Sequence, residues 1–243
     1  MAVWQGGGLS LLGFGRFSNQ TYATAVGEKT AVTLPDGSVV TLNTDSVLRT
    51  RADRDRRLVY LDKGQAFFRV AKNARRPFIV HAAGRTVTAV GTAFDVRVDA
   101  RRFEVTLVEG KVRVEAPAAP PARGPAASSG EPTPVRATEM LAGDQFVAAD
   151  PRHWSVSQTD TGRETAWLSG RLKFQGEPLG EVAEEFNRYS ERKIVVADPA
   201  LARRPISGTF QATDEEAFVQ ALQVAGLAQV SARSDAEITI APS

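Results

Sequence analysis

The sequence contains no cysteine and only two histidines, His81 and His153, among 243 residues. The missing thiols exclude disulfide bonds, thiolate nucleophiles and cysteine-based zinc sites, and two histidines leave little for a histidine-based metal centre. We therefore expect no metal and no cofactor. With 42% apolar and 24% charged residues, the chain has the composition of an ordinary globular protein, which argues against wholesale disorder and against a polytopic membrane protein.

The first twenty residues are apolar but do not provide a membrane span. Five glycines and a glutamine interrupt the apolar residues before Arg16, whereas a spanning helix needs about 20 mostly apolar positions. A signal peptide would also need a basic start before its apolar run. We interpret residues 1–20 as a frayed or foreign terminus or as the truncated end of a membrane anchor.

Basic side chains are concentrated in the front half of the chain. Residues 1–115 carry 18 Lys or Arg and 11 Asp or Glu, although the whole chain has a net charge of only +2. The densest run, residues 49–57, is interleaved with aspartates that weaken its field and has no aromatic residues on which bases could stack. We expect a solvated, self-paired surface loop and no nucleic acid partner, and the pattern leaves open whether this half faces anionic lipid.

Residues 30–114 contain short β-type runs separated by turn residues every eight to twelve positions, which is typical of an all-β fold. The segment Pro35-Asp36-Gly37 between TAVTL and SVVTL predicts a hairpin, because proline and glycine favour the two central turn positions. Strict alternation in FDVRVD, RFEVTL and KVRVE predicts strands with one apolar face. The pattern does not distinguish a sandwich from a solenoid-like stack.

A Pro/Ala-rich segment, residues 116–137, interrupts this pattern. Proline lacks an N–H and fixes φ, so we expect a linker or loop there rather than a central strand. Residues 139–148 resume a strand-like pattern. We therefore predict one all-β domain over residues 21–160, with the loop as an insertion.

Residues 161–243 change character, because helix signals alternate with strands. Pro178 followed by Leu179, Val182, Phe186 and Tyr189 predicts an amphipathic helix that exposes Glu181, Glu184, Glu185 and Arg188. Thr213 and Glu216 form a capping-box pair before a second helix, with Phe218, Ala221, Leu222 and Ala225 on one face. The predicted order is β-α-β and then β-α-β-β in a small α+β domain that shares one sheet.

Several separate motifs occur in the order found in one known family. The stretches VTLPDGSVVTLNTDS, RRLVYLDKGQAFFRVAKNARRPFIVHA, AVGTAFDVRVD, VTLVEGKVRVE and LAGDQF resemble the periplasmic region of FecR-type anti-sigma regulators. The segment WLSGRLKFQGEPLGEVAEEFNRYS resembles the small C-terminal domain of these proteins, which is akin to the short N-terminal (STN) domain of secretins and TonB-dependent transporters. The resemblance covers residues 22–243.

This resemblance implies a role in cell-surface signalling by Gram-negative bacteria. Family members lie in the inner membrane, bind an ECF sigma factor through a cytoplasmic segment, and use a periplasmic region to contact the N-terminal signalling domain of a TonB-dependent outer-membrane transporter. Such signalling commonly controls iron and siderophore uptake genes. We expect this chain to hold the periplasmic sensing part without the cytoplasmic segment, its single membrane span being absent or truncated.

We expect the partner to bind the C-terminal domain. An exposed sheet edge can accept a partner strand through main-chain hydrogen bonds. The candidate surface comprises strand residues 171–175 and 206–210 and the adjacent helix, with Arg171, Phe174, Leu179, Arg188, Ile206 and Phe210. Core packing is the simpler role for the phenylalanines, and we expect Trp167 to dock the C-terminal part against the β domain.

One further motif raises the question of self-cleavage. Some members of the family cleave themselves at a Gly-Thr step in a GTxF motif, which is present here as Gly91-Thr92-Ala93-Phe94. The threonine hydroxyl would attack the preceding carbonyl, and water would open the resulting ester, provided that a base is near. The local candidates for that base are His81, Asp95 and Glu109, while the simpler reading is a tight turn with glycine at positive φ.

Beyond self-cleavage, the sequence argues against an enzyme. The pairs Glu184-Glu185 and Glu215-Glu216 are expected on outward helix faces, and no serine has evident His and Asp partners. The alternatives to a signalling module are a polysaccharide-associated β protein and a secretin-like assembly module.

Overall fold

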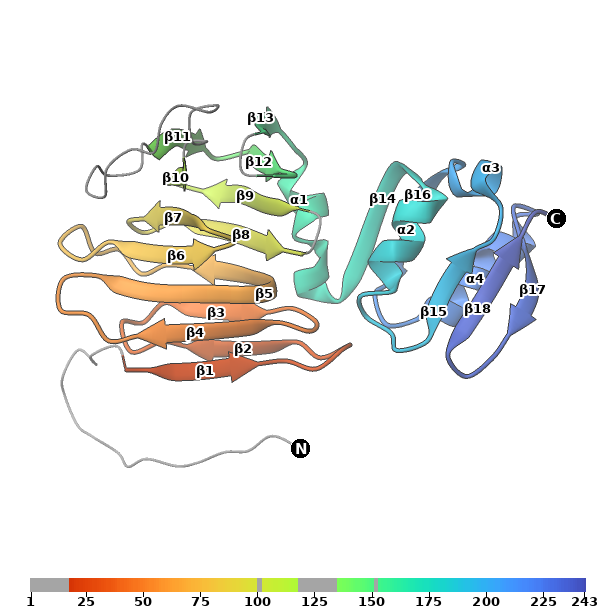
Figure 1. Cartoon of the computed structure of the whole chain (residues 1–243), viewed down its shortest axis with the longest axis horizontal. Helices are drawn as coiled ribbons and strands as arrows, with labels where there is room; N and C mark the ends of the chain where they lie inside the picture. Colours follow the sequence, from red (N-terminus) through yellow and green to blue (C-terminus); the bar gives the residue numbers. More distant parts are fainter. Residues whose placement is uncertain (1–17, 100–101, 118–134, 151–152) are drawn as a thin grey trace, which may run out of the picture.

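The computed structural model describes residues 18–99, 102–117, 135–150 and 153–243. The expectation for the first twenty residues therefore falls almost wholly outside the described residues. Within these ranges no helix is long and apolar enough to cross a bilayer. The chain forms a larger β unit, a short helical connector and a C-terminal unit that lies beyond one end of the β unit (Figure 1).

The β unit contains thirteen strands in one continuous sheet. The strands are β1 (Gln20–Ala23), β2 (Thr30–Thr33), β3 (Val39–Leu42), β4 (Val47–Arg51), β5 (Arg57–Arg69), β6 (Phe78–Ala82), β7 (Arg85–Ala89), β8 (Ala93–Val98), β9 (Phe103–Glu109), β10 (Lys111–Pro117), β11 (Val135–Leu141), β12 (Asp144–Ala148) and β13 (Trp154–Gln158). They are stacked from β1 at the bottom to β13 at the top in Figure 1, with β4 below β3 and β8 below β7.

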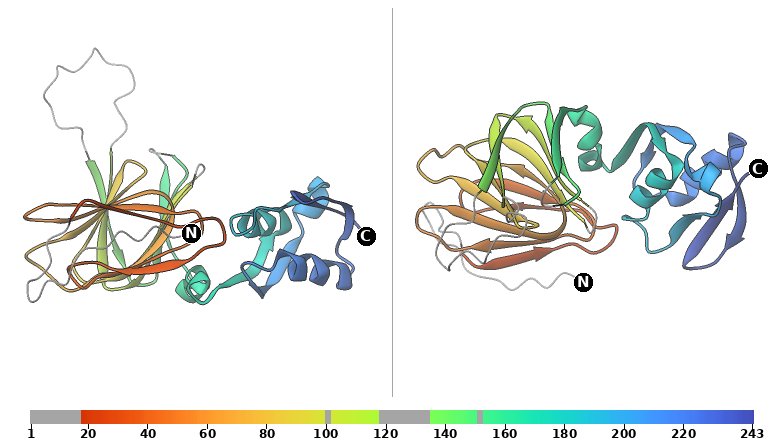
Figure 2. Two further views of the ribbon diagram at one scale, coloured as in Figure 1. Left: turned by 90° about the horizontal axis from the view of Figure 1, so that it is seen from below. Right: turned by 45° about the horizontal axis from the view of Figure 1, so that its top comes forward.

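Strand β5 joins two faces of this sheet. Its first half pairs with β4 and β6, and its second half pairs with β3 and β8. One face continues through β7, β10 and β11, and the other through β9, β12 and β13. The sheet therefore rolls around the core, with the two packed faces of a sandwich and a sequential stacking of strands like that of a solenoid (Figure 2).

Alternation along the strands supplies the core of the β unit. Phe68 on β5 is fully buried, with its ring 5.1 Å from that of Phe94 and 5.9 Å from that of Phe78. Neighbours of these residues in the strands, such as Phe67 and Asp95, point to the outer side of the same face, because successive side chains alternate. This outer side is where the connector packs.

The Pro/Ala-rich segment is an insertion at a hairpin. Strands β10 and β11 pair antiparallel from Lys111↔Leu141 to Pro117↔Val135, so both ends of the segment lie side by side. The predicted loop boundaries of 116–137 are too wide, because Ala116 and residues 135–137 belong to these strands. Residues 118–134 lie outside the described residues.

The connector and the C-terminal unit follow β13. The connector contains α1 (Thr161–Glu164) and the 3-10 helix η1 (Ala166–Ser169); the C-terminal unit contains β14 (Arg171–Pro178), α2 (Leu179–Phe186), β15 (Lys193–Val196), α3 (Pro199–Ala202), β16 (Pro205–Gln211), α4 (Glu215–Val224), β17 (Gln229–Arg233) and β18 (Glu237–Ala241). Gly170 separates the connector from β14 with φ +74°, a left-handed conformation that glycine adopts without steric cost.

The prediction of one shared sheet in the C-terminal unit is wrong. Strand β14 pairs only with β16, while β15, β18 and β17 form a separate sheet. Strand β15 runs parallel to β18 and is an edge strand of that sheet, and its outer edge faces the end of α2. Its Ile194 exchanges two hydrogen bonds there with the side chain of Asn187, at 2.7 and 2.9 Å, and these bonds take the place of another strand.

The N-cap of the second helix, α4, lies one residue later than predicted. Asp214 is the N-cap of α4 and accepts a hydrogen bond from the Ala217 amide at 2.9 Å, so Thr213 is not part of a capping box. An aspartate competes well for this position, because its carboxylate also faces the positive end of the helix dipole. The buried face contains Phe218, Val219 and Leu222, whereas Ala221 and Ala225 are exposed.

The C-terminal unit has a core of its own that is built around phenylalanines. The ring of Phe186 on α2 lies 4.4 Å from that of Phe218 on α4 and 6.1 Å from that of Phe174 on β14. A second, small cluster joins the connector to the β unit, with Trp167 packed against Phe67 and Ala93. The expected docking role of Trp167 is confirmed.

Candidate functional site

A buried carboxylate on the outer side of β8 receives the connector. Asp95 is 4% exposed. Its Oδ2 accepts a hydrogen bond from Trp167 Nε1 at 3.1 Å, and its Oδ1 accepts one from Gln65 Nε2 at 2.8 Å. Both donors are neutral, so no positive charge directly balances the carboxylate.

This environment changes the protonation of Asp95. Burial raises its pKa from 3.8 to about 7, and the hydrogen bonds from Gln65 and Trp167 offset only part of that increase. The docking site therefore contains an acid that titrates near neutral pH.

Gln65 extends the contact to the C-terminal unit. Its Oε1 accepts hydrogen bonds from Asn43 Nδ2 at 2.9 Å and from Arg188 Nη2 at 2.8 Å. Asn43 also donates to the Tyr189 hydroxyl at 2.7 Å. Burial raises the pKa of Tyr189 to about 12, so its hydroxyl stays protonated at neutral pH. Residues from β5, from the β3–β4 turn and from the end of α2 are thus joined in one network.

Charged side chains on α2 complete this network. Glu185 accepts from Arg188 Nη1 at 2.5 Å and from Arg97 Nη1 of the β unit at 2.8 Å. The three side chains are 15–19% exposed. The expectation that Glu185 and Arg188 face solvent is wrong, because the polar face of α2 packs against the polar end of the β unit.

The ion pairs hold Glu185 in its charged form. Although burial opposes ionisation, the positive charges of Arg188 and Arg97 keep the pKa of Glu185 below its ordinary value. Burial likewise disfavours the charge of Arg97, yet Glu185 and its acidic neighbours raise the pKa of Arg97 above the usual range. A charged pair excluded from water is costly once one partner is lost.

Further hydrogen bonds to backbone groups hold the same end of the β unit against the connector and the C-terminal unit. Thr44 Oγ1 donates to the carbonyl of Arg188 at 2.8 Å and accepts from the Gly27 amide at 2.8 Å. A Cβ on Gly27 would lie 2.9 Å from the Tyr189 carbonyl, so only glycine permits this approach. Lys29 Nζ donates to the carbonyl of Leu168 at 2.6 Å.

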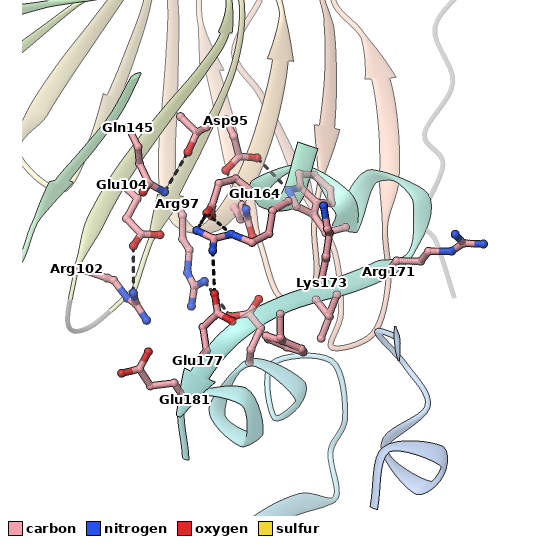
Figure 3. A pocket seen from close by; sticks show the side chains of 17 residues that line it. Asp95, Arg97, Arg102, Glu104, Gln145, Glu164, Arg171, Lys173, Glu177 and Glu181 are labelled. Atoms are coloured by element: carbon pink, nitrogen blue, oxygen red, sulfur yellow. Dashed lines mark hydrogen bonds and ion pairs between the residues drawn. The ribbon is translucent and has the colours of Figure 1, made fainter. Parts of the chain in front are cut away.

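A cleft of about 250 Å³ lies beside Asp95 between β8–β9, the connector and β14 (Figure 3). Its charged side chains are largely paired: Arg102 with Glu104, and Arg163 with both Glu164 and Glu177. Figure 3 shows Arg171 directed away from the cleft. This pairing leaves little unbalanced charge for a small ion.

The groups around Asp95 and Glu185 join the two units through hydrogen bonds and ion pairs. Within the described residues no group of three or more potential metal ligands comes together. The buried carboxylate of Asp95 accepts hydrogen bonds from the Gln65 amide and the Trp167 indole. In a hydrolase, a carboxylate in this position would instead orient a histidine base or act on a nucleophile. What the arrangement provides is a polar interface whose groups are all satisfied only while the two units touch.

Most of the sequence-predicted partner-binding residues serve the core instead. Leu179, Ile206 and Phe174 are 0–9% exposed, and Phe210 packs against the same core. Arg188 belongs to the network described above. Arg171 alone is well exposed. A partner surface on this unit would therefore rest on Arg171 and on the polar side chains of β16, with the buried residues holding the strands in place.

The Gly91-Thr92 step lies in the turn between β7 and β8. Gly91 has φ +104°, and the buried Thr92 hydroxyl has no hydrogen-bond partner among the described residues. Of the three candidate bases, Asp95 is bonded to Gln65 and Trp167, His81 stacks on Tyr60 with ring centroids 4.8 Å apart, and Glu109 is exposed at the end of β9. Self-cleavage remains a prediction, and no hydrogen bond prepares the hydroxyl for attack.

Sequence reasoning missed the central residues of the interface. Asp95 was considered only as a base, and Asn43, Gln65 and Arg97 were not singled out. A usable signal was present in FDVRVD and GQAFF, since a charged or amide residue on the outer side of a central strand requires a partner when it is buried.

Comparison with known proteins gives a consistent result. Residues 20–113 match the model of the family described as FecR protein. Two crystal structures of a protein from Parabacteroides distasonis described as a "putative anti-sigma factor" superpose with a TM-score of 0.73 and 26% identity. The matches cover 93% and 92% of this chain and 100% and 99% of those chains. No curated protein matches the chain.

The family match lies within the β unit, and the structural matches extend through the connector into the C-terminal unit. Together these findings support the expectation that the chain is part of a FecR-type regulator.

Proposed function

We propose that this chain is the periplasmic signal-receiving region of a FecR-type anti-sigma regulator. In this proposal it binds the N-terminal signalling domain of a TonB-dependent outer-membrane transporter and relays the signal across the inner membrane to an ECF sigma factor that controls iron or siderophore uptake genes. The observation that carries the proposal is the likeness to a "putative anti-sigma factor" over 93% of the chain, both units included.

Strand β16 offers the most regular free edge of the C-terminal unit for strand addition, because a register shift between Gln175 and Glu177 interrupts the other strand of its sheet, β14. Asn187 occupies the outer edge of β15, and a register shift between Val230 and Ala232 interrupts β17, which weakens its value as a template. Strand β16 pairs only with β14 in the described structure, and Ser207, Thr209 and Gln211 are exposed along it. A partner strand added there would gain main-chain hydrogen bonds.

A route from this edge to the interface follows from chain connectivity. Strand β14 pairs with β16 and ends at Pro178, where α2 begins directly at Leu179. Near its end α2 carries Glu185, which is ion-paired with Arg97 of the β unit. A partner that shifts β14 and β16 would strain this ion pair, and the contact between the two units would report the binding event.

Calorimetric titration of the chain with the signalling domain of the transporter encoded nearest its gene tests this proposal. We expect saturable binding and slower amide exchange in residues 205–211. Arg171→Glu should weaken binding, because Arg171 is exposed beside this edge, whereas Lys111→Glu, an exposed charge reversal on β10, should have no effect.

Two results would contradict the proposal. The first is no binding to the signalling domain of any transporter encoded in the same genome. The second is binding that protects β17 rather than β16, which would retain the partner but reject the assigned edge.

A further inference from the structure

The end of the β unit opposite the C-terminal unit gathers several turns that are rich in basic residues. Arg57 Nη1 binds Asp36 of the β2–β3 turn at 2.6 Å and the Ala71 carbonyl at 2.9 Å. Arg76 Nη2 donates to the Asp53 carbonyl at 2.9 Å. These bonds bring residues 34–38, 51–57 and 69–76 to one end, which we call the basic end.

Two more turns belong to the basic end. The Val70 amide donates to the Thr92 carbonyl at 2.9 Å, and a Cβ on Gly110 would lie 2.7 Å from Thr92 Cγ2. The five turns, residues 34–38, 51–57, 69–76, 90–92 and 109–111, contain nine Lys or Arg and only four Asp or Glu. The end as a whole is therefore strongly cationic.

Much of this positive charge is free to act outward. Arg57 is buried and paired with Asp36, which corrects the expectation that the whole run of residues 49–57 is solvated. Arg54, Arg56 and Arg75 are exposed, and their side chains form no ion pair within the described part of the chain. Asp53 accepts hydrogen bonds from the backbone amides of Asp55 and Arg56 through one oxygen, and its charge interacts with that of Arg56, so it offsets only part of the positive charge of this loop.

The chain also enters the β unit at the basic end. Strand β1 begins at Gln20, which pairs with Thr50 at the end of β4. Thr50 Oγ1 donates to the Ser18 carbonyl at 2.7 Å, and the Ala52 amide donates to Asn19 Oδ1 at 3.1 Å. The chain therefore enters the fold beside the arginine-rich loop, while the C-terminal unit lies at the far end (Figure 1).

We propose that the basic end is a docking surface for a bilayer that contains anionic phospholipid. Exposed cationic turns suit a surface of phosphate headgroups, because each Lys or Arg near such a surface adds electrostatic attraction without needing a shaped pocket. The missing aromatic residues disfavour single-stranded nucleic acid, which requires stacking platforms. Docked in this way, the β unit would hold the C-terminal unit away from the membrane. The proposal does not depend on which partner the C-terminal unit binds.

Vesicle co-sedimentation of the full chain tests the proposal. We expect binding to vesicles with about one third phosphatidylglycerol to exceed binding to pure phosphatidylcholine vesicles at low ionic strength, and the difference to shrink at 0.5 M NaCl through screening. The triple variant Arg54→Ser, Arg56→Ser, Arg75→Ser should weaken the anionic-vesicle component by on the order of 100-fold. These side chains make no contacts that the fold requires, so the variant should fold normally.

A matched control removes the same charge from the other end of the molecule. Arg171, Arg203 and Arg204 are exposed on the C-terminal unit, and changing all three to serine should leave vesicle binding unchanged. The comparison of the two vesicle types separates charge-driven binding at the basic end from insertion of the apolar residues 2–14, because such insertion would not require anionic lipid. Equal binding to both vesicle types, an equal loss in the control variant, or binding to duplex DNA in place of vesicles would overturn the proposal.

Discussion

Trp167 donates its indole N–H to the buried carboxylate of Asp95 across 72 residues of sequence. This bond joins the connector to the outer side of the β unit, and Gln65 on the other oxygen of Asp95 links it to Arg188. The contact between the two units is therefore organised around one acid with a raised pKa and one ion-paired helix.

The raised pKa of Asp95 predicts a pH dependence of stability. Because the folded-state pKa of about 7 exceeds the ordinary value, the folded chain binds the proton more tightly than the unfolded chain. The resulting stabilisation is full below about pH 4 and is lost as the pH rises through about 7, with a limiting slope of about 1.4 kcal/mol per pH unit.

Denaturant unfolding of the wild type and of Asp95→Asn between pH 5.5 and 8.5 measures this effect. The wild type should lose stability relative to Asp95→Asn as the pH increases, because the amide does not titrate. Parallel profiles for the two proteins would show that Asp95 does not titrate in this range.

Removing the charge of Glu185 should loosen the contact between the units. Glu185→Gln removes the negative charge that Arg97 and Arg188 share and replaces one of the two acceptor oxygens with an N–H donor, and we expect a loss of about 1–3 kcal/mol. Glu181→Gln is the matched control, since Glu181 is exposed on the same helix. Amide exchange at Arg188 and Tyr189 should accelerate in the first variant only, and equal exchange in both variants would count against a structural role for the ion pair.

Cleavage at Gly91-Thr92, if it occurs, should not separate the fragments. Strand β5 pairs with β8 from Gly64↔Val98 to Arg69↔Ala93, so the two pieces would share the central sheet. We expect fragments ending at Gly91 and beginning at Thr92 under denaturing electrophoresis, one particle under native conditions, and an intact chain for Thr92→Ala. Fragments that persist in Thr92→Ala would exclude the hydroxyl as nucleophile.

The two cores should respond separately to a cavity. Phe186 is fully buried in the C-terminal unit, and Phe186→Ala should cost about 3–5 kcal/mol. The loss should fall on β14–β18, while proteolysis of the β unit stays at the wild-type rate. A matched change, Phe68→Ala, should destabilise the β unit instead. If either variant opened both units to protease equally, the cores would be coupled more strongly than their separation indicates.

Local patterns predicted most elements but not their contacts. The helix of α2 and the hairpins follow from periodicity and turn chemistry, which depend on neighbouring residues. The polar face of α2 has the same pattern whether it meets water or another polar surface, so Glu185 and Arg188 were assigned to solvent. Their partners Arg97 and Gln65 lie 88 and 123 residues away, beyond the range of any local signal. The split between the β14–β16 and β15–β18–β17 sheets likewise depends on long-range pairing.

The placement of the chain ends on the β unit has a mechanical consequence. The chain enters β1 at the basic end, and the C-terminal unit lies beyond the opposite end (Figure 1). Tension between these points runs along the strands, and the β1–β4 hydrogen bonds, which lie across the strands, are loaded together in shear. The polar contact at Asp95 and Glu185 has no such ladder. Under tension this polar contact would break before the β1–β4 hydrogen bonds do. The β unit would then transmit the force while it stays folded.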